Sequence, residues 1–484
     1  MSLTDREMHP LAVEEPGRNA VLPLVGAGLL VCALAAVVVV AMPDGPALGL
    51  GVLFAVPLLA GGVFLLYRYP WLASWGALAL FSTTAELRLR VNPIVGVLKD
   101  GYVVLLVVLL LVWLRTRPSP LPRLRPVALP LSAFALLVGM YVLDPAGTHG
   151  TSWLFATRLL VQVLALFTVG LLLDPQRTAE HLVRAMCVVL PFEAAFAWLQ
   201  QVAGEWRLVH SWGYEFGAQV RQTSGGGLRT SGTFEDPFQL TALAVLGLAV
   251  AFFLARRTQA VILIGSALAV LAATSVRTAL VQVGVLLVLY AVRRGLAREA
   301  AALAAVAAVA GVLILATTTT AIYPGAPEEP LLFSLNGRST SWSLAVDGWQ
   351  SLVTGNGVGT RGTGSTRTST SVTAPPRYDP SAAPTAAFAG DPAFLDSSYA
   401  QVQSDVGIVG SLALLTALGG LVVLLVRRCR DRSDGAAWAA AGVLAVSLVD
   451  WVGRSSLASY TTGFLTLYVL GVLIGATRTP EMIG

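Results

Sequence analysis

Charged residues are scarce in this chain of 484 residues. Asp, Glu, Lys and Arg together make up 12% of it, whereas soluble domains carry roughly 25%. Hydrophobic residues make up 55%, and the mean hydropathy is +0.73. This composition excludes a soluble globular protein and indicates an integral membrane protein with many spans.

Two residue types are nearly absent. Lys99 is the only lysine, so the formal charge of +5 comes almost wholly from arginine. Membrane topology accounts for this basic balance better than nucleic-acid binding does, so we expect no nucleic-acid partner. Cysteine occurs only at Cys32, Cys187 and Cys429, in or beside predicted helices, and we expect neither a disulfide framework nor a metal site.

Apolar runs near the roughly twenty residues that cross a bilayer can be placed along the whole chain. The first follows a polar tail, residues 1–20, without the basic region and cleavage site of a signal peptide, so we expect a retained anchor. We predict an all-α, polytopic, GT-C-like transmembrane domain over residues 1–484, with about fourteen spans. The predicted spans are 21–42, 47–67, 71–87, 94–114, 127–143, 151–173, 178–203, 237–255, 259–275, 277–293, 298–318, 406–426, 436–451 and 457–476.

Arginine placement predicts the orientation, because short cytoplasmic loops are enriched in Lys and Arg. Most arginines between the spans fall on the side that both termini share, and we assign that side to the cytoplasm of a bacterium. The arginines of the opposite side break this rule, so we expect them to meet something anionic at the outer face of the cytoplasmic membrane. They are Arg88, Arg90, Arg207, Arg221, Arg229, Arg277, Arg338, Arg361, Arg367 and Arg377.

Two predicted extracytoplasmic segments are long, residues 204–236 and 319–405. In the second, "NGRSTSWSLAVDGWQSLV" spaces Arg338, Trp342 and Trp349 at helical intervals, which predicts a short amphipathic helix on the outer membrane surface. The Ser, Thr, Gly and Pro residues that follow are typical of a mobile loop. "FLDSSYAQVQSDVGIVG" then returns the chain to the bilayer.

Two arginines are candidates for an anion site. Arg229, in "LRTSGTFEDPFQL", offers a planar fork that matches phosphate oxygens at two points; the alternative is an ion pair with Glu235 or Asp236. Arg277, in "ATSVRTAL", lies between two helices with almost no loop. Lipid exposure there costs several kcal/mol, so Arg277 faces a polar cavity or a partner; the alternative is a helix-capping or interface role.

Other ionisable residues offer weaker hypotheses. A carboxylate at the membrane edge, such as Asp396, accepts a proton from a hydroxyl if burial raises its pKa; the alternative is a helix N-cap. Glu193 and Arg158 are intramembrane charges that need partners and suit either a shared cavity or a proton relay. The glycines of "GNGVGT" resemble a phosphate loop but lack its strand–loop–helix context.

Four patterns occur together in one order: "RTSGTFEDPFQLTAL", "SVRTAL", "GRSTSW…GNGVG" and "LDSSYAQVQSDVGIVG". This order resembles the O-antigen ligase and polymerase superfamily, integral membrane glycosyltransferases of bacterial surface polysaccharide. The resemblance covers roughly residues 205–425, while the earlier helices agree only in being transmembrane. It implies a glycan donor on a polyprenyl diphosphate in the outer leaflet, attacked at its anomeric carbon by an acceptor hydroxyl, with inversion and without a metal, cofactor or nucleotide sugar.

The resemblance also implies roles for individual residues. By position, Arg229 and Arg277 match the family's diphosphate-binding arginines, and Arg338 matches the arginine before its loop tryptophan. Fixed arginines stabilise the charge that develops on the leaving diphosphate, in place of a divalent cation. Ligases of the family often carry His-Asn where this chain has Asp396 and Ser397, so the implied base here is Asp396. The weaker glycan contacts expected are Trp342, Trp349 and Tyr399.

Polymerase activity is preferred over ligase activity, with an acceptor glycan or lipid, membrane lipids, and a flippase and chain-length regulator as the expected partners. The family's Pro-Asn after the first pattern is Pro237-Phe238 here, which weakens the match. A rival from another class is a proton-coupled transporter that uses Glu193, Asp100 and Arg158. A third hypothesis is an inactive relative that serves as an assembly partner.

Overall fold

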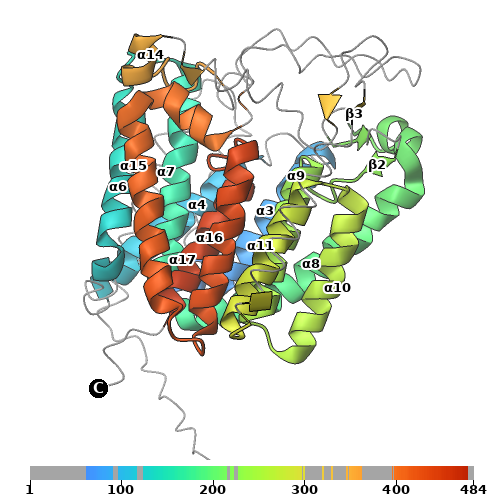
Figure 1. The fold of residues 1–484 in the computed structure, drawn as a ribbon. Coiled ribbons are helices and arrows are strands. Elements are labelled where there is room, and N and C mark those ends of the chain that lie inside the picture. Colours follow the sequence, from blue (N-terminus) through green and yellow to red (C-terminus); the bar gives the residue numbers. More distant parts are fainter. Residues whose placement is uncertain are drawn as a thin grey trace, which may run out of the picture. The chain divides into compact units, whose positions relative to one another are not determined.

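The computed structural model describes residues 61–90, 96–116, 124–214, 219–222, 227–296, 298–299, 319–320, 329–330, 345–346, 348–361, 395, 397–459 and 461–477. These residues form helices and two short antiparallel ribbons (Figure 1). The helices are α3 (Leu72–Arg90), α4 (Gly96–Thr116), η3 (Arg125–Val127), α6 (Ala128–Leu143), α7 (Thr151–Leu172), α8 (Pro175–His210), α9 (Pro237–Phe253), α10 (Arg257–Thr274), α11 (Thr278–Arg293), α14 (Trp349–Thr354), α15 (Ser398–Arg428), α16 (Gly435–Gly453) and α17 (Thr462–Ala476). The ribbons pair β1 (Arg221–Gln222) with β2 (Leu228–Arg229), and β3 (Thr319–Thr320) with β4 (Glu329–Pro330).

The chain divides into two compact units, residues 1–69 with 105–120, and residues 70–104 with 121–484. In the described part of the smaller unit, the Tyr67 ring meets Trp113 edge-on, and its hydroxyl donates to Thr116 Oγ1 at 3.1 Å. The larger unit contains every sequence-predicted site residue.

Six helices among the described residues are long and apolar enough to cross a membrane, and three shorter ones are apolar. The six are η3 continued by α6, then α7, α8, α10, α15 and α16, and the shorter three are α9, α11 and α17. The protein is therefore an all-α, multi-pass membrane protein, as its composition predicts. The predicted ranges from 71–87 to 277–293, and from 406–426 onward, coincide with described helices. Because 21–42, 298–318 and most of 47–67 lie outside the described residues, the count of fourteen stays a prediction.

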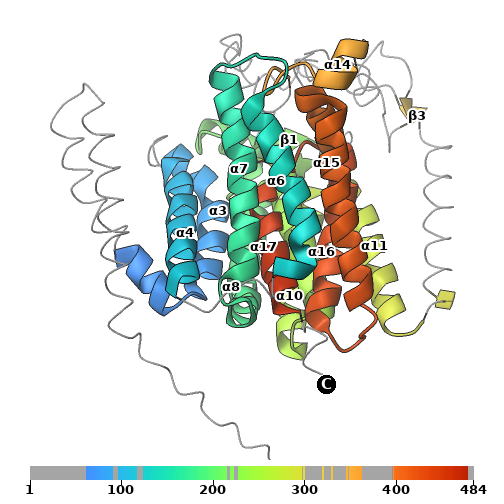
Figure 2. The same cartoon turned by 90° about the vertical axis from the view of Figure 1, so that its left-hand side faces the viewer.

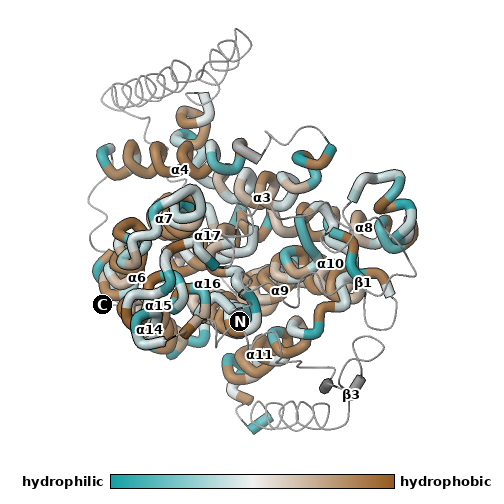
Figure 3. Tube along the Cα trace, turned by 90° about the horizontal axis from the view of Figure 1, so that it is seen from above, coloured by the Kyte–Doolittle hydropathy of each residue, from teal (hydrophilic) through white to brown (hydrophobic). Residues whose placement is uncertain are grey.

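Within the larger unit, helices distant in sequence run side by side. α17 packs along α7, α15 packs along α6, and α10 packs against α8 and α9 (Figures 1 and 2). Seen from above, hydrophobic residues predominate along these helices (Figure 3). Leu136 of α6 is 53% exposed and Leu412 of α15 is 56% exposed, as expected of side chains that face lipid.

Glycine allows the close packing of α7 with α17. A methyl group on Gly170 would meet the Tyr468 carbonyl oxygen and the Val472 nitrogen, and one on Gly471 would overlap the Phe167 carbonyl. Small residues at such crossings let two helix backbones approach, which is the main source of packing energy inside a membrane.

Three breaks in the helices differ from the sequence expectation. α8 continues past the predicted span end at 203 to His210, after a turn at Gly204 with φ of 77°. α15 begins at Ser398 rather than 406 and is interrupted at Gly407, where φ is 66°. The predicted amphipathic helix ending at Trp349 is wrong in its last turn, because Gly348, with φ of 110°, separates Ala345 from α14. A positive φ suits glycine and cannot continue a right-handed helix.

The glycine packing predicts opposite effects for two Gly→Ala changes. Gly471→Ala forces the α7 and α17 backbones apart and costs about 1–3 kcal/mol of stability, as overpacking does. Gly419→Ala in α15 meets nothing within 4 Å and gains up to about 1 kcal/mol of helix propensity. Thermal unfolding of the two variants in the same detergent should move in opposite directions. A neutral Gly471→Ala would show that α7 and α17 do not meet at these glycines.

Candidate anion-binding site

Two arginines face each other across the β1–β2 ribbon. Arg221 of β1 is the cross-strand partner of Arg229 of β2. Side chains directly opposite on antiparallel strands lie about 5 Å apart at Cβ, and like charges there are destabilising. This pairing therefore concentrates positive charge at one point of the surface.

A third arginine reaches the same point because β2 is tied to the end of α10. Gln201 Nε2 donates to the carbonyls of Leu228 and Ala273, both at 2.9 Å, and Thr230 Oγ1 donates to Ala273 at 3.3 Å. The chain then turns at Ser275, where φ is 49°, and Arg277 becomes the N-cap of α11. The positive end of the α11 macrodipole adds to the charge of Arg277.

Arg229 has no compensating acid among the described residues. Its Nε is buried without a hydrogen-bond partner, and its pKa is lowered first by burial and then by the charges of Arg277 and Arg221. The two acids that the sequence offers as partners are engaged elsewhere. Glu235 pairs with Arg88 at 3.1 Å, while Asp236 lies 3.8 Å from Arg454 and accepts from Gln239 N at 2.8 Å as the cap of α9. The alternative of an ion pair for Arg229 is therefore not what the structure contains.

We call Arg221, Arg229 and Arg277 the arginine triad. Its members come from two sequence patterns separated by α9 and α10, and the structure brings them within electrostatic range of one another. A multivalent anion relieves repulsion within such a cluster, and a diphosphate matches both the charge and the forked geometry of guanidinium groups.

Arg454 is a neighbour that the sequence analysis missed. Its guanidinium lies 4.6 Å from the centre of the Phe238 ring, and that of Arg221 lies 5.3 Å from the same centre. Arg454 also pairs with Asp450 at 3.3 Å. The signal in the sequence is an arginine in the short polar break "VGRSS" between two predicted spans.

The start of α15 is fastened to the Arg454 backbone. Ser398 Oγ donates to the Arg454 carbonyl at 2.8 Å, and Ser397 Oγ donates to Trp451 O at 3.1 Å. Ser397 is also the N-cap of α15, so the capping role offered as the alternative for Asp396 belongs to its neighbour. The candidate base Asp396 itself lies outside the described residues.

A buried carboxyl group and a buried amide hold the loop between Arg229 and α9. Glu193 is fully buried and accepts from Thr233 N at 3.0 Å and from Thr233 Oγ1 at 2.5 Å. Gln200 accepts from Gly232 N at 2.9 Å and donates to the Gly232 carbonyl at 2.7 Å. Gly232 has φ of 60° and lies so close to Glu193 that a Cβ would collide with the carboxyl group. These contacts give Glu193 a positioning role for the loop that carries Arg229.

The "GNGVG" loop uses its backbone amides on internal carboxylates. Gly359 N donates to Asp405 Oδ1 at 3.2 Å, and Val358 N donates to Asp144 Oδ1 at 3.1 Å. Tyr141 completes the site of Asp405 with a hydrogen bond of 2.8 Å. The loop is thus a packing element between α15 and the α6–α7 connection, which agrees with discounting it as a phosphate loop.

The other predicted site residues are not part of the arginine triad. Arg338 and Trp342 lie outside the described residues. Trp349, on α14, is 76% exposed and lies over α15, away from β1 and β2 (Figure 3). Tyr399 is half-buried, with its hydroxyl 3.5 Å from the Leu448 carbonyl.

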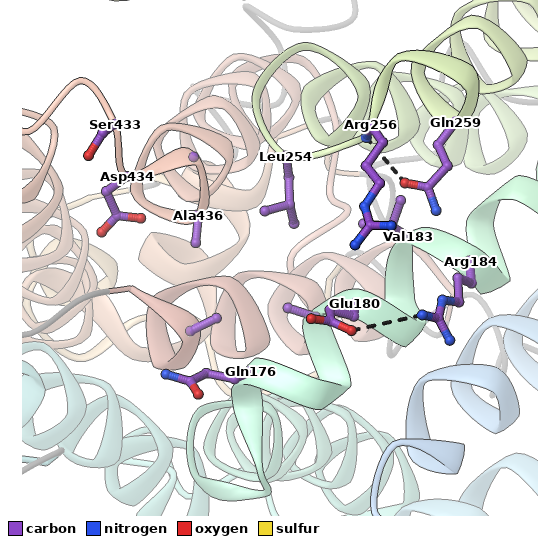
Figure 4. A pocket seen from close by; sticks show the side chains of 13 residues that line it. Gln176, Glu180, Val183, Arg184, Leu254, Arg256, Gln259, Ser433, Asp434 and Ala436 are labelled. Carbon is purple, nitrogen blue, oxygen red and sulfur yellow. Dashed lines mark hydrogen bonds and ion pairs between the residues drawn. The ribbon is translucent and has the colours of Figure 1, made fainter. Parts of the chain in front are cut away.

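A cavity of about 460 Å³ lies at the opposite end of the helices, between the starts of α8, α10 and α16 (Figure 4). Charges of both signs line it, including Glu180 and Arg184, which pair at 3.9 Å, and Asp434. This balance gives it no preference for an anion. In the part of the chain that the structure describes, no group of three or more His, Cys, Asp or Glu side chains could hold a metal ion.

No family model matches this chain, and none of the curated proteins matches it. The functional argument therefore rests on the residues and their geometry.

The charge imbalance of the arginine triad predicts the behaviour of Arg229→Gln. Without an anion the variant loses no thermal stability, and relief of the cross-strand repulsion gains up to about 1 kcal/mol. Inorganic pyrophosphate raises the unfolding temperature of the unmodified protein but not that of the variant, because a ligand stabilises only the state that binds it.

Arg88→Gln is the matched control for Arg229→Gln. It removes one arginine of the same end but breaks the ion pair with Glu235. It should keep the pyrophosphate response and gain no stability. Equal stabilisation of Arg229→Gln and the unmodified protein by pyrophosphate would contradict the anion site.

The contacts of Glu193 predict that its shape matters and its charge does not. In Glu193→Gln the amide still accepts from Thr233 N and donates to Thr233 Oγ1, so fold and pyrophosphate binding persist. Glu193→Ala leaves the Thr233 amide buried without a partner, which costs about 1–3 kcal/mol. Thermal unfolding and pyrophosphate titration of both variants test this. If Glu193→Gln abolished pyrophosphate binding in a folded protein, the positioning role would be wrong.

Proposed function

We propose that this protein is a membrane glycosyltransferase that transfers or polymerises polyprenyl-diphosphate-linked glycans at the outer face of the bacterial cytoplasmic membrane. The observation that carries the proposal is the arginine triad, in which Arg229 keeps a buried Nε without a partner beside two further arginines. The order of sequence patterns that resembles the O-antigen ligase and polymerase superfamily supports the same activity.

The chemistry follows from where charge develops. The acceptor hydroxyl attacks the anomeric carbon, the bond from that carbon to the diphosphate oxygen breaks, and polyprenyl diphosphate leaves with an added negative charge. Guanidinium groups already fixed around the diphosphate stabilise that charge without rearranging, which is the usual origin of electrostatic catalysis. Asp396 is the proposed acceptor of the hydroxyl proton, and its neighbour Ser397 is anchored beside Arg454.

The contacts of Phe238 offer a reason for the departure from the family's Pro-Asn pair. In this chain the ring at that position lies under the guanidinium groups of both Arg221 and Arg454. Cation–π contacts hold guanidinium groups in place at about 0.5–1 kcal/mol each at exposed sites and more when they are desolvated. An aromatic side chain can thus position the cations that surround a diphosphate.

The transporter hypothesis receives less support from the same contacts. Glu193 binds the loop of Thr233, whereas Asp100 pairs with Arg158 at 3.4 Å and accepts from Gln162 at 2.9 Å. These charges have separate local partners, and a proton relay needs them to be connected. We keep polymerase activity as preferred over ligase-type transfer to a separate acceptor.

The decisive variants are Arg277→Ala and Arg277→Lys. Loss of one group that stabilises developing charge costs roughly 100- to 1,000-fold in turnover. Lysine supplies a point charge without the planar fork, so Arg277→Lys should also lose most of the activity. The measurement is release of polyprenyl diphosphate by purified protein in lipid, with a lipid-linked oligosaccharide from its own host.

Arg207→Ala is the control, since Arg207 is exposed beyond the break in α8 and has no place in the arginine triad. It should leave turnover unchanged. Full activity of Arg277→Lys would contradict two-point binding of the diphosphate. The glycan products separate the two activities: a ladder of longer glycans without added acceptor indicates a polymerase, and release only with an added acceptor indicates a ligase.

A further inference from the structure

A second group of arginines lines a cavity at the other end of the helices. The cavity has a volume of about 370 Å³ and lies between the ends of α9 and α11 and the connection from α15 to α16. We call it the basic pocket. Its charged and aromatic lining residues are Phe252, Phe253, Tyr290, Arg293, Arg294 and Arg432.

Aromatic side chains and carbonyl groups hold two of these arginines. Arg294 donates from Nε and Nη2 to the Tyr290 hydroxyl at 3.1 and 2.9 Å. Arg293 donates to the Phe253 carbonyl at 2.8 Å and to the Arg432 carbonyl at 3.1 Å. These partners are neutral, so they orient the guanidinium groups and leave their charges uncompensated.

Arg432 completes the basic pocket. No hydrogen bond or ion pair of its guanidinium with another described residue is found, and the group lies against Gly295, where φ is 81° and a side chain would crowd it. The nearest acids have local roles. Asp434 acts on the charge of Arg293 and accepts from Ala437 N at 3.1 Å as the cap of α16, and Asp431 accepts from Ser433 N at 2.8 Å. No acid lines the pocket itself.

Apolar side chains lead away from the basic pocket along α11. Leu280, Leu287 and Arg294 are seven residues apart, so they share one helix face. Leu280 is 72% exposed and Leu287 is 41% exposed, and a side chain at Gly284 between them would meet nothing within 4 Å. An exposed apolar face that ends in arginine suits a ligand with acyl chains and an anionic head.

We propose that the basic pocket binds the phosphate of an anionic phospholipid from the leaflet at this end of the helices. The arginine-rich connections assign this end to the cytoplasm. Arginine pockets between membrane helices on that side suit phosphate headgroups, and each basic residue near an anionic surface strengthens binding roughly fivefold. The lipid is a ligand that fixes α9, α11 and the α15–α16 connection together, whether or not the proposed transferase activity is correct.

The test compares phosphatidylglycerol with phosphatidylcholine of the same acyl chains, added to the full chain in detergent and counted by native mass spectrometry. The unmodified protein should bind phosphatidylglycerol in preference to phosphatidylcholine. The double variant Arg294→Gln with Arg432→Gln should lose roughly 25-fold in affinity for phosphatidylglycerol, fivefold for each arginine.

The matched control is Arg427→Gln with Arg430→Gln, which removes the same charge from exposed positions outside the pocket. Its affinity should stay within about twofold, against the roughly fivefold expected of each pocket arginine. If both double variants weakened binding equally, general surface electrostatics would replace the pocket. Displacement of the lipid by equimolar inorganic phosphate would also overturn the proposal, because the site would then take a free anion.

Tyr290→Phe keeps the test valid if the double variant fails to fold. It preserves every charge and removes only the hydroxyl that orients Arg294. Weaker phosphatidylglycerol binding with unchanged phosphatidylcholine binding supports the pocket. Unchanged phosphatidylglycerol binding by a folded Tyr290→Phe would contradict it.

Discussion

Like charges brought together repel, and a fold that keeps Arg221 opposite Arg229 must supply the opposing free energy elsewhere. The repulsion of such a cross-strand pair amounts to about 0.2–1 kcal/mol. Glu193 and Gln200 together make four hydrogen bonds to Gly232 and Thr233, and a buried bond contributes about 1 kcal/mol. The scaffold therefore outweighs the repulsion, and the positive cluster persists until an anion arrives.

This scaffold is built from side chains inside the helices, while the arginines that it positions lie at their ends. α8 contributes both Glu193 and Gln200, and its residue Gln201 fixes β2 to α10 through Ala273. Arg229 and Arg277 thus belong to one rigid arrangement, although α9 and α10 separate them in sequence. Preorganised charge of this kind suits a reaction whose leaving group gains negative charge. At the other end, Arg293 and Arg294 are held by neutral partners in the same way, which suits binding a lipid headgroup and not chemistry.

The helices were predictable because an apolar run of about twenty residues has few other structures open to it in a membrane. The membrane class and the ranges of most described helices follow from composition and run length. Glycine positions such as Gly348 and Gly407 were not predictable as breaks, because glycine is common in membrane helices and only the fold decides which one adopts a positive φ.

For the site, charge placement was informative and pairing was not. Arg229 and Arg277 could be selected because arginine on the outer side breaks the positive-inside rule. Their partners could not be selected, since Glu235 and Asp236 are nearest in sequence but bind Arg88 and Arg454. Arg454 escaped notice because its two partner segments, at Asp236 and at Ser398, lie far from it in sequence. Long-range pairs of this kind depend on tertiary packing and carry no local pattern.

The central claim is that the arginine triad binds the diphosphate of a lipid-linked glycan. The most direct measurement is a cryo-electron microscopy structure of the full chain in lipid nanodiscs, incubated with polyprenyl diphosphate. The account predicts density for the two phosphates in contact with Arg229 and Arg277, with the prenyl chain passing between helices into the bilayer. Diphosphate density elsewhere on the protein, with the triad empty at saturating ligand, would contradict it.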